Sequence, residues 1–422
     1  MRANLGPDVG ALVSGYAPRG TRLLLASMYL ATVPMGYLVV VLPLYLTRAG
    51  LEPPFIGLLY TVSGIVSAAL VAFSGVFADR WGRRRFLLAG TLLPIPSYLI
   101  LATTTDPAWL VVASILGGVG LANGAAGALT IASFDALLAE RAPADLRTRV
   151  FAAGQALWSL AFATGSFAAA LPDLLRGLLS TPSELDVYRG PFLGMVAVTV
   201  VAAVLLLPVR DDPAVRAARV ASGWWPSRSR RAIATYALAI GFLGFGLGIA
   251  VQLMPLWFNL RFGVTEAELG PWYGAAQILS FGTVAIIPWL ERHLGAPRTV
   301  MVALSIAGIC LALIVLAPVF TVAALLFLVR GFVTNLSWPF HQSLLMAATV
   351  PEERATAVGA GFAVWGLANA AGPFAAGSLL AAGVFGLPLL VGAVMYVAGG
   401  VVFGIGFARI QRRDAAAATV AA

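Results

Sequence analysis

The sequence has no lysine, one cysteine and two histidines among 422 residues, and only 11% of its residues are charged. The lack of lysine excludes a Gly-rich phosphate loop ending in Gly-Lys-Ser/Thr, which argues against a nucleotide-driven pump. A membrane enzyme would need a nucleophile, a metal site or an acid–base pair, and the sequence offers no such set. Cys310 lies in an apolar stretch, where we expect it to pack. The sequence therefore predicts no enzyme activity, no cofactor and no metal site.

Apolar residues, by contrast, make up 60% of the chain, and the mean hydropathy is +0.91. Soluble globular domains do not have this composition. A helix needs roughly 20 mostly apolar residues to cross a bilayer. We expect an all-α integral membrane protein that keeps residues 1–21, because these are not apolar enough for a cleavable signal. The twelve expected spans are 22–47, 55–77, 86–104, 109–139, 149–170, 191–208, 232–259, 269–290, 298–317, 319–346, 355–382 and 385–408.

The 27 basic residues are all arginines, and their distribution predicts the orientation of the chain. The loops between the expected spans place 22 of them on one side and four on the other, with Arg330 inside a span. The arginine-rich side is cytoplasmic by the positive-inside rule, and an even number of spans places both termini there. The net charge of +9 thus reflects topology rather than nucleic-acid binding. Abundant arginine, alanine and glycine are typical of a GC-rich bacterial genome, so we expect a multi-pass protein of the bacterial inner membrane.

An internal repeat divides the chain into two related halves. Retention of a repeat for packing alone is one explanation, but two halves around a central cleft also suit a structure that opens alternately to each side. We expect two pseudo-symmetric six-helix bundles, 22–208 and 232–408, joined by a cytoplasmic linker at 209–231 and followed by a tail at 409–422. Shifts of 207 to 213 positions align Gly50, Gly57, Tyr60, Gly154, Trp158, Gly165 and Phe167 with Gly263, Gly270, Tyr273, Gly361, Trp365, Gly372 and Phe374.

The segment after the second expected span reads GVFADRWGRRR, residues 75–85. It resembles the signature loop of the major facilitator superfamily, which implies the twelve-span fold and solute transport. In that family the equivalent Asp and Arg bind the start of the eleventh span and an acidic residue at the cytoplasmic end of the fourth, which closes the cytoplasmic side. The alternative is that these arginines only anchor the topology. The resemblance implies a cytoplasmic gate of Gly75, Asp79, Arg80, Gly82, Arg83 and Asp135.

Arg330 is the one charge that the expected spans place near the middle of the membrane, about 15 Å along the tenth span at about 1.5 Å per residue. An ionisable side chain at this depth is costly and points to a function. In the family the tenth span lines the central cleft, and a guanidinium suits carboxylate, phosphate or sulfonate oxygens. The alternative is an arginine held by backbone carbonyls or by a broken helix.

Other polar residues in the spans are candidates for the translocation path or for bonds between helices. Asn335, Trp338 and Gln342 follow at spacings of three and four and can share a helix face. His341 titrates in the physiological range but is expected near the cytoplasmic mouth. The seventh span is rich in glycine, which would either soften the helix or allow close packing. The full expected path is Arg330, Asn335, Trp338, His341, Gln342, Tyr37, Asn123, Gln252 and Asn369.

These patterns predict a transporter that moves a small solute by alternating access, either actively or by facilitation. By analogy with the family, we expect an exporter of amphipathic or anionic small molecules. A non-transporting receptor or scaffold on the same fold is the alternative. Only Asp135 provides a carboxylate inside an expected span, so no obvious proton carrier remains if it belongs to the gate. The expected partners are the lipid bilayer and a small-molecule substrate, with the protein as a monomer.

Overall fold

The computed structural model describes residues 19–117, 124–141, 147–178, 183–209, 229–350 and 353–421. Within these ranges it describes only the backbone of residues 72–81, 131–132, 136, 139–140, 147–149, 284–285, 355 and 413–421. No strand occurs in the described ranges. Helices satisfy their own backbone hydrogen bonds, as a structure surrounded by hydrocarbon requires.

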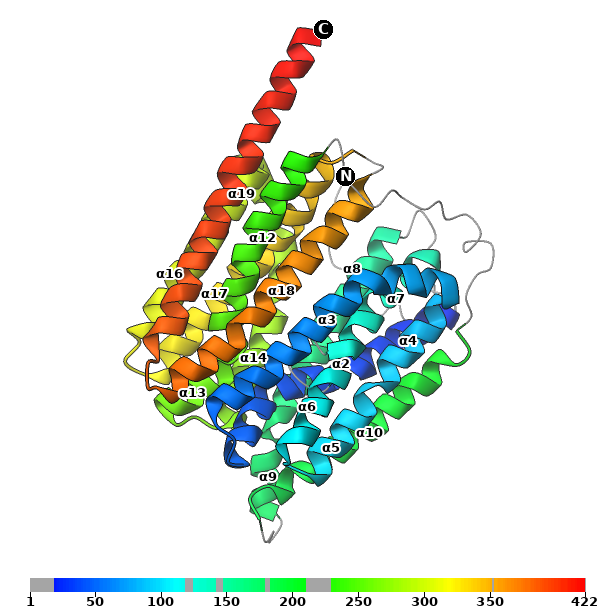
Figure 1. Cartoon of the computed structure of the whole chain (residues 1–422), viewed down its shortest axis with the longest axis vertical. Helices are drawn as coiled ribbons and strands as arrows, with labels where there is room; N and C mark the ends of the chain where they lie inside the picture. Colours follow the sequence, from blue (N-terminus) through cyan, green and yellow to red (C-terminus); the bar gives the residue numbers. More distant parts are fainter. Residues whose placement is uncertain are drawn as a thin grey trace.

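The first half of the chain, residues 19–209, forms helices that run alternately between two ends of the molecule (Figure 1). Several expected spans consist of two consecutive helices, because a proline or glycine interrupts them. The helices are α2 (Arg19–Arg48), α3 (Pro53–Trp81), α4 (Arg83–Leu92), α5 (Pro94–Thr103), α6 (Pro107–Leu116), α7 (Gly124–Arg141), α8 (Arg147–Phe167), the 3-10 turn η2 (Ala168–Ala170), α9 (Leu171–Leu178) and α10 (Asp186–Leu206).

The second half, residues 229–421, repeats this arrangement. Its first span is broken at residues 251–253, and its second span bends by 61°. The helices are α12 (Arg230–Ala250), α13 (Met254–Phe262), α14 (Glu266–Leu279), the 3-10 turn η3 (Ser280–Gly282), α15 (Thr283–Leu294), α16 (Ala296–Val315), α17 (Phe320–Ala347), α18 (Arg354–Ala381) and α19 (Gly386–Ala421).

Within the described ranges, nine helical segments are long and apolar enough to cross a membrane, or ten if the bent pair Glu266–Gly282 and Ile286–Leu294 is one span. This confirms the all-α membrane architecture. The other two expected spans, 109–139 and 355–382, coincide with α6 and α7 and with α18. The number of twelve, and the division of the chain at 209–231, which falls mostly outside the described residues, stay predictions.

The repeat in the sequence corresponds to equivalent helix contacts. A Cβ atom added to Gly36 on α2 would lie 2.0 Å from the carbonyl oxygen of Phe162 on α8. The same change at Gly248 on α12 would place Cβ 2.1 Å from the carbonyl oxygen of Asn369 on α18. The two contacts are related by shifts of 212 and 207 positions. The glycines of the seventh span thus allow close packing, as one of the two expected uses proposed.

We call the end of the molecule where α2 begins and α10 ends the proximal end, and the opposite end, with the loops after α2 and α13, the distal end (Figure 1). Helices α3 and α18 lie side by side between the two halves, and α14 packs on α8. A Cβ atom on Gly57 would lie 2.3 Å from the Pro373 carbonyl oxygen, and one on Gly270 would lie 2.4 Å from that of Ser166. These two contacts are again equivalent in the repeat, and both join the halves in their distal portions.

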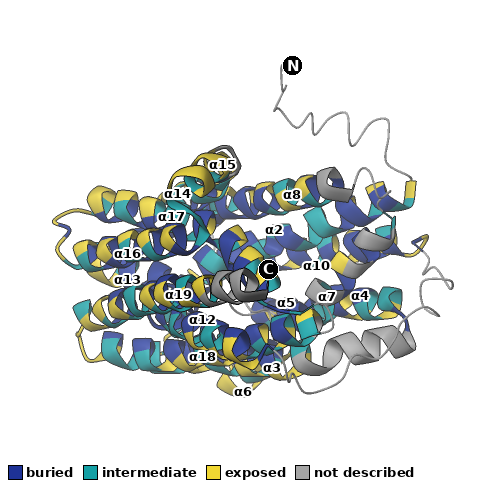
Figure 2. Cartoon of the chain, turned by 90° about the horizontal axis from the view of Figure 1, so that it is seen from above, coloured by how far each residue is buried: buried dark blue, intermediate teal, exposed yellow. Residues whose placement is uncertain are grey.

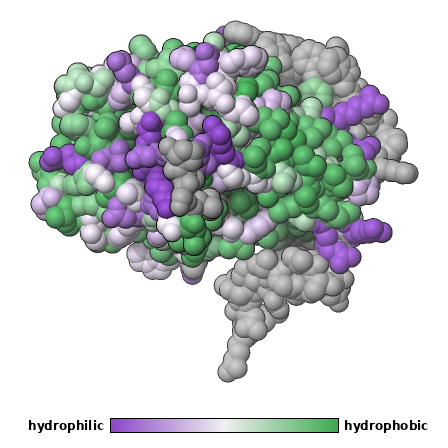
Figure 3. All heavy atoms as spheres, turned by 90° about the horizontal axis from the view of Figure 1, so that it is seen from below, coloured by the Kyte–Doolittle hydropathy of each residue, from purple (hydrophilic) through white to green (hydrophobic). Residues whose placement is uncertain are grey.

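Exposed residues lie mostly on the outward faces of the helices, and buried residues between them (Figure 2). Large apolar side chains are among the exposed ones, including Leu316 at 77% and Trp289 at 55%. Seen from below, hydrophobic residues cover much of the surface and hydrophilic residues gather in patches between them (Figure 3). An apolar exterior of this extent suits contact with lipid rather than with water.

Candidate functional site

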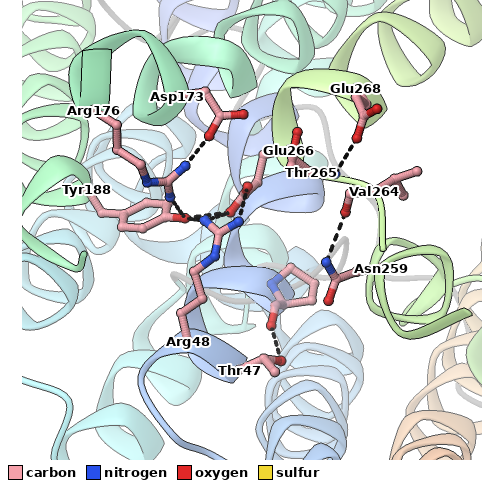
Figure 4. Close-up of polar contacts among 11 residues, drawn as sticks. Thr47, Arg48, Asp173, Arg176, Tyr188, Asn259, Val264, Thr265, Glu266 and Glu268 are labelled. Atoms are coloured by element: carbon pink, nitrogen blue, oxygen red, sulfur yellow. Dashed lines mark hydrogen bonds and ion pairs between the residues drawn. The ribbon is translucent and has the colours of Figure 1, made fainter. Parts of the chain in front are cut away.

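A charged network joins the two halves at the distal end, and its centre is Glu266 (Figure 4). The Arg48 guanidinium donates to both carboxylate oxygens of Glu266, with Nη1–Oε1 at 2.6 Å and Nη2–Oε2 at 2.8 Å. Glu266 is fully buried, while the Arg48 side chain is 22% exposed. This two-pronged geometry is the strongest form of a carboxylate–guanidinium pair.

Three residues of the first half extend the network. The Tyr188 hydroxyl donates to Glu266 Oε1 at 2.5 Å. Arg176 Nη2 donates to the Tyr188 oxygen at 3.0 Å, and Arg176 also pairs with Asp173. Helix α2 provides Arg48, α9 provides Arg176 and Asp173, and α10 provides Tyr188 (Figure 4). Helices α2 and α10 therefore bond directly to the Glu266 carboxylate of α14, and α9 joins the network through Tyr188.

Local sequence signals explain why these two charges lie where they do. Arg48 is in the last turn of α2, where a cation is favoured, and Glu266 is in the first turn of α14, where an anion is favoured. Gly50 ends the α2 region with φ +84°, which favours glycine. Thr265 caps α14, and its backbone N–H donates to Glu268 Oε2 at 2.8 Å.

The sequence analysis missed this network because it started the eighth span at residue 269 and so placed Glu266 in a loop. The helix begins three residues earlier, so Glu266 lies in its first turn and its side chain is fully buried. The capping box of Thr265 and Glu268 was the available signal for this boundary.

Arg330 on α17 is a second buried charged residue. It is 7% exposed, and its Nη1 donates to the Tyr396 hydroxyl at 3.0 Å. The guanidinium carbon lies 4.7 Å from the centre of the Phe327 ring. Among the described side chains, no carboxylate pairs with Arg330, its Nε has no hydrogen-bond partner, and no backbone carbonyl accepts from it. The arrangement leaves a positive charge that can bind an anionic group.

Of two tyrosines that are equivalent in the repeat, Tyr273 lies near Arg330, and Tyr60 lies near Tyr273. The Tyr273 ring is 5.2 Å from that of Phe327, and Tyr273 interacts electrostatically with both Arg330 and Tyr60. The hydroxyl groups of Tyr60 and Tyr273 are buried and have no hydrogen-bond partner among the described residues. Tyr60 belongs to the first half and Tyr273 to the second. The sequence analysis used these tyrosines only as repeat markers.

The remaining path residues of α17 take different surroundings. Asn335 is exposed and donates to Ser280 Oγ at 2.8 Å, which binds α17 to η3. Trp338 lies 6.4 Å from Trp365 between ring centres. His341 is fully buried and stacks on Phe403 of α19 at 4.4 Å, and neither ring nitrogen has a partner among the described residues. Gln342 is half-buried. Their part in a translocation path stays a prediction.

Gln252 and Asn369 form a bond between helices within the second half. Gln252 Nε2 donates to Asn369 Oδ1 at 2.8 Å, and Asn369 Nδ2 donates to the Gly244 carbonyl oxygen at 3.2 Å. The Gln252–Asn369 hydrogen bond stabilises the break between α12 and α13, because Gln252 lies in that break. Tyr37 on α2 is buried, its hydroxyl has no partner among the described residues, and it interacts electrostatically with Glu266. Asn123 lies outside the described residues.

The expected gate motif is described in part. Gly82 has φ +98° between α3 and α4, so the tight turn does require glycine. Arg83 begins α4, and Arg84 Nη2 donates to the Leu207 carbonyl oxygen at the end of α10, at 2.6 Å. Asp135 is an exposed residue of α7. The structure describes only the backbone at Gly75, and the side chains of Asp79 and Arg80 lie outside the described part, so the gate stays a prediction.

The sequence pattern of the Major Facilitator Superfamily matches residues 23–373, most of the chain. The chain belongs to the Major Facilitator Superfamily. Membership of this transporter family supports membrane transport as the general function and confirms the resemblance of the loop at residues 75–85. The matching yeast protein, "Uncharacterized membrane protein YJR124C" of Saccharomyces cerevisiae, is 27% identical over 180 residues, which are 42% of this chain and only 40% of that protein.

Solved structures of other superfamily members have the same fold. A bacterial homologue of the human lysosomal transporter Spinster, inward-facing and unoccupied, matches with a TM-score of 0.71 and 16% identity over 94% of this chain and 99% of its own. The nucleoside transporter NupG matches with a TM-score of 0.70 and 15% identity over 92% of this chain and 99% of its own. The human organic anion transporter MFSD10 matches with a TM-score of 0.59 and 18% identity over 91% of this chain and 99% of its own. At these identities the likeness shows the fold alone.

Proposed function

We propose that this superfamily member moves a small solute across the membrane by alternating access, as a secondary active or facilitative transporter. The observation that carries the proposal is the asymmetric contact between the halves. Gly57 on α3 meets Pro373 on α18, Gly270 on α14 meets Ser166 on α8, and Arg48 pairs with Glu266, all in the distal portion. A protein closed at one end in this way needs a second arrangement to release solute there.

The substrate in this proposal is an amphipathic or anionic small molecule, which the protein exports. Arg330 supports the anionic part, since it is buried without a carboxylate partner among the described side chains. The unpartnered hydroxyls of Tyr60 and Tyr273 can donate to oxygens of the same ligand. The aromatic rings of Phe327 and Tyr273 offer apolar contact beside the charge.

The proposed setting is the inner membrane of a bacterium, with the proximal end and both termini in the cytoplasm and the protein acting as a monomer. The arginine distribution supports this orientation, because the expected loops and termini on that side contain 22 of the 27 arginines. The distal end then faces away from the cytoplasm. A receptor or scaffold without transport is the competing function, and only a transport measurement separates the two.

Proteoliposomes loaded with the anionic dye carboxyfluorescein test both the function and the residue. We expect proteoliposomes with the wild-type protein to release the dye faster than dye-loaded liposomes without protein. Arg330→Ala should lose most of this rate, because the anion loses its buried counter-charge. Arg330→Lys keeps the charge without the planar fork and should retain part of the rate.

Rhodamine 6G, a cationic dye of similar size, is the matched probe, and its release should not fall in Arg330→Ala. Equal carboxyfluorescein release by wild type and Arg330→Ala would show that Arg330 does not bind substrate. No release of either dye by the wild type would argue for the receptor or scaffold.

A further inference from the structure

Glu266 is the one carboxylate that is fully buried among the described side chains, and its strongest partner comes from the other half of the molecule. Arg48 is on α2 and Glu266 is on α14. Any movement that separates the distal ends of the two halves must pull the guanidinium from the carboxylate. The bond is therefore part of the distal closure and not only of local packing.

The charges of the network cancel in the closed form. Arg48 and Arg176 provide two positive charges, and Asp173 and Glu266 provide two negative charges. If the halves separate while Glu266 is ionised, its charge stays on α14 without a counter-charge beside it. Leaving one member of a buried ion pair alone is strongly unfavourable. A proton on Glu266 removes that charge and turns the hydrogen bonds from Arg48 into contacts with a neutral carboxyl group.

We propose that the Glu266 carboxylate is a proton-binding site, and that its protonation from the distal side releases Arg48 and opens the distal end. The proton binds one carboxylate oxygen and no other bond changes. The inference rests on the proposed alternating access and adds the ion that would drive or regulate it. Arg48, at 22% exposure, is the member of the pair that water reaches.

The groups around Glu266 on every neighbouring element are consistent with this assignment. Helix α2 provides Arg48 and Tyr37, α9 provides the mutually paired Asp173 and Arg176, and α10 provides Tyr188. On α17, Arg330 lies near Tyr273 and bonds to Tyr396 instead. On α14 itself, Glu268 is exposed and caps the helix. Asp173 has its partner within the same helix, so opening the distal end does not separate that pair.

The repeat shows that this pair is not a general feature of both halves. The position equivalent to Arg48 is Arg261, at the end of α13, and the position equivalent to Glu266 is Pro53. Arg261 is exposed and lies over the Phe262 ring at 5.9 Å. The pair therefore occurs once, and Glu268, two residues along the same helix, is a matched control for Glu266.

A distance measurement on the full chain in lipid nanodiscs tests the proposal without a substrate. Spin labels on Glu52→Cys and Arg261→Cys, in a Cys310→Ala background, report the separation of the halves because both positions are exposed at the distal end. We expect the wild-type network to give a short distance at about pH 8 and a growing population of longer distances towards about pH 5, near the range where a carboxyl group titrates.

Glu266→Gln cannot lose or gain the proton and should give the same distances at both pH values. Glu268→Gln should respond like the wild type, since glutamine also serves in a capping box. The double variant Arg48→Glu/Glu266→Arg exchanges the two charges, keeps a titratable pair and should therefore keep the pH response of the distance.

An acid response that survives in Glu266→Gln, or a wild-type network with no response, would overturn the proposal. Neither result concerns dye release, so transport can hold while this inference fails. An acid response that depends on Glu266 in a protein that releases neither dye would instead support the inference and contradict the proposed transport.

Discussion

At the residue scale, Glu266 and Arg330, the buried carboxylate and the buried arginine among the described side chains, have opposite arrangements. Glu266 is satisfied by Arg48 and Tyr188, whereas Arg330 has only the Tyr396 hydroxyl and the Phe327 ring among the described residues. A satisfied pair contributes to one conformation and is broken in another. An unsatisfied charge can be completed by a bound ligand of opposite charge, which is the role proposed for Arg330. The sequence analysis found the second kind, because an arginine deep in an apolar segment stands out without knowledge of its neighbours.

Removal of Arg48 should destabilise the protein, because it leaves Glu266 buried without its counter-charge. We expect Arg48→Ala to lower the free energy of unfolding by roughly 3 kcal/mol at about pH 8, as for other broken buried pairs. Arg261→Ala removes the repeat-equivalent but exposed arginine and should change it by under about 1 kcal/mol. Thermal denaturation of the purified variants in one detergent measures both. Equal melting temperatures for the two variants would show that the Arg48 pair does not stabilise the closed form.

At the element scale, glycines set how closely helices approach, and the same device serves two purposes. Gly36 on α2 and Gly248 on α12 permit contacts within each half, while Gly57 on α3 and Gly270 on α14 permit contacts between the halves. The sequence showed Gly57 and Gly270 as repeat partners but not which helix each one meets. That choice depends on the arrangement of all the helices, so only the tertiary structure identifies Gly57 as a contact between halves.

Substitution of glycine by alanine at these two kinds of site should have different effects. Gly57→Ala places a Cβ atom 2.3 Å from the Pro373 oxygen and should favour the distally open form. Gly36→Ala clashes within one half and should lower stability by roughly 1–3 kcal/mol without changing the balance of forms. The spin-label distance between positions 52 and 261 separates the two outcomes. This assignment would be contradicted if the distance increased in Gly36→Ala or did not increase in Gly57→Ala.

At the scale of the whole molecule, charge and contact divide it into unlike ends. Most arginines of the described residues lie at the proximal helix ends, and the distal portions hold the glycine contacts and the Arg48–Glu266 pair. The halves are similar in sequence, yet only one of the two arginines equivalent in the repeat, Arg48, has a buried carboxylate partner among the described side chains. The symmetry is therefore broken at the point where the distal closure is held.

The orientation in the membrane can be tested with the thiol chemistry of the chain. The native Cys310 is buried, so new cysteines can be labelled selectively. In intact bacterial cells expressing the protein, we expect an impermeant maleimide to label Ser183→Cys in the distal loop but not Ser222→Cys in the linker. Permeabilised cells should label both. The reverse pattern would place the proximal end outside and would refute the proposed cytoplasmic termini.

The sequence by itself determined the membrane class, the repeat and the superfamily, because hydropathy, spacing and the loop at residues 75–85 are all local along the chain. It also identified Arg330, since a charge in an apolar segment needs no neighbour to be conspicuous. Only the tertiary structure decided which charges and glycines meet across the two halves. Arg48 and Glu266 are 218 positions apart, and each reads as an ordinary residue at a helix end until folding brings the two helix ends together.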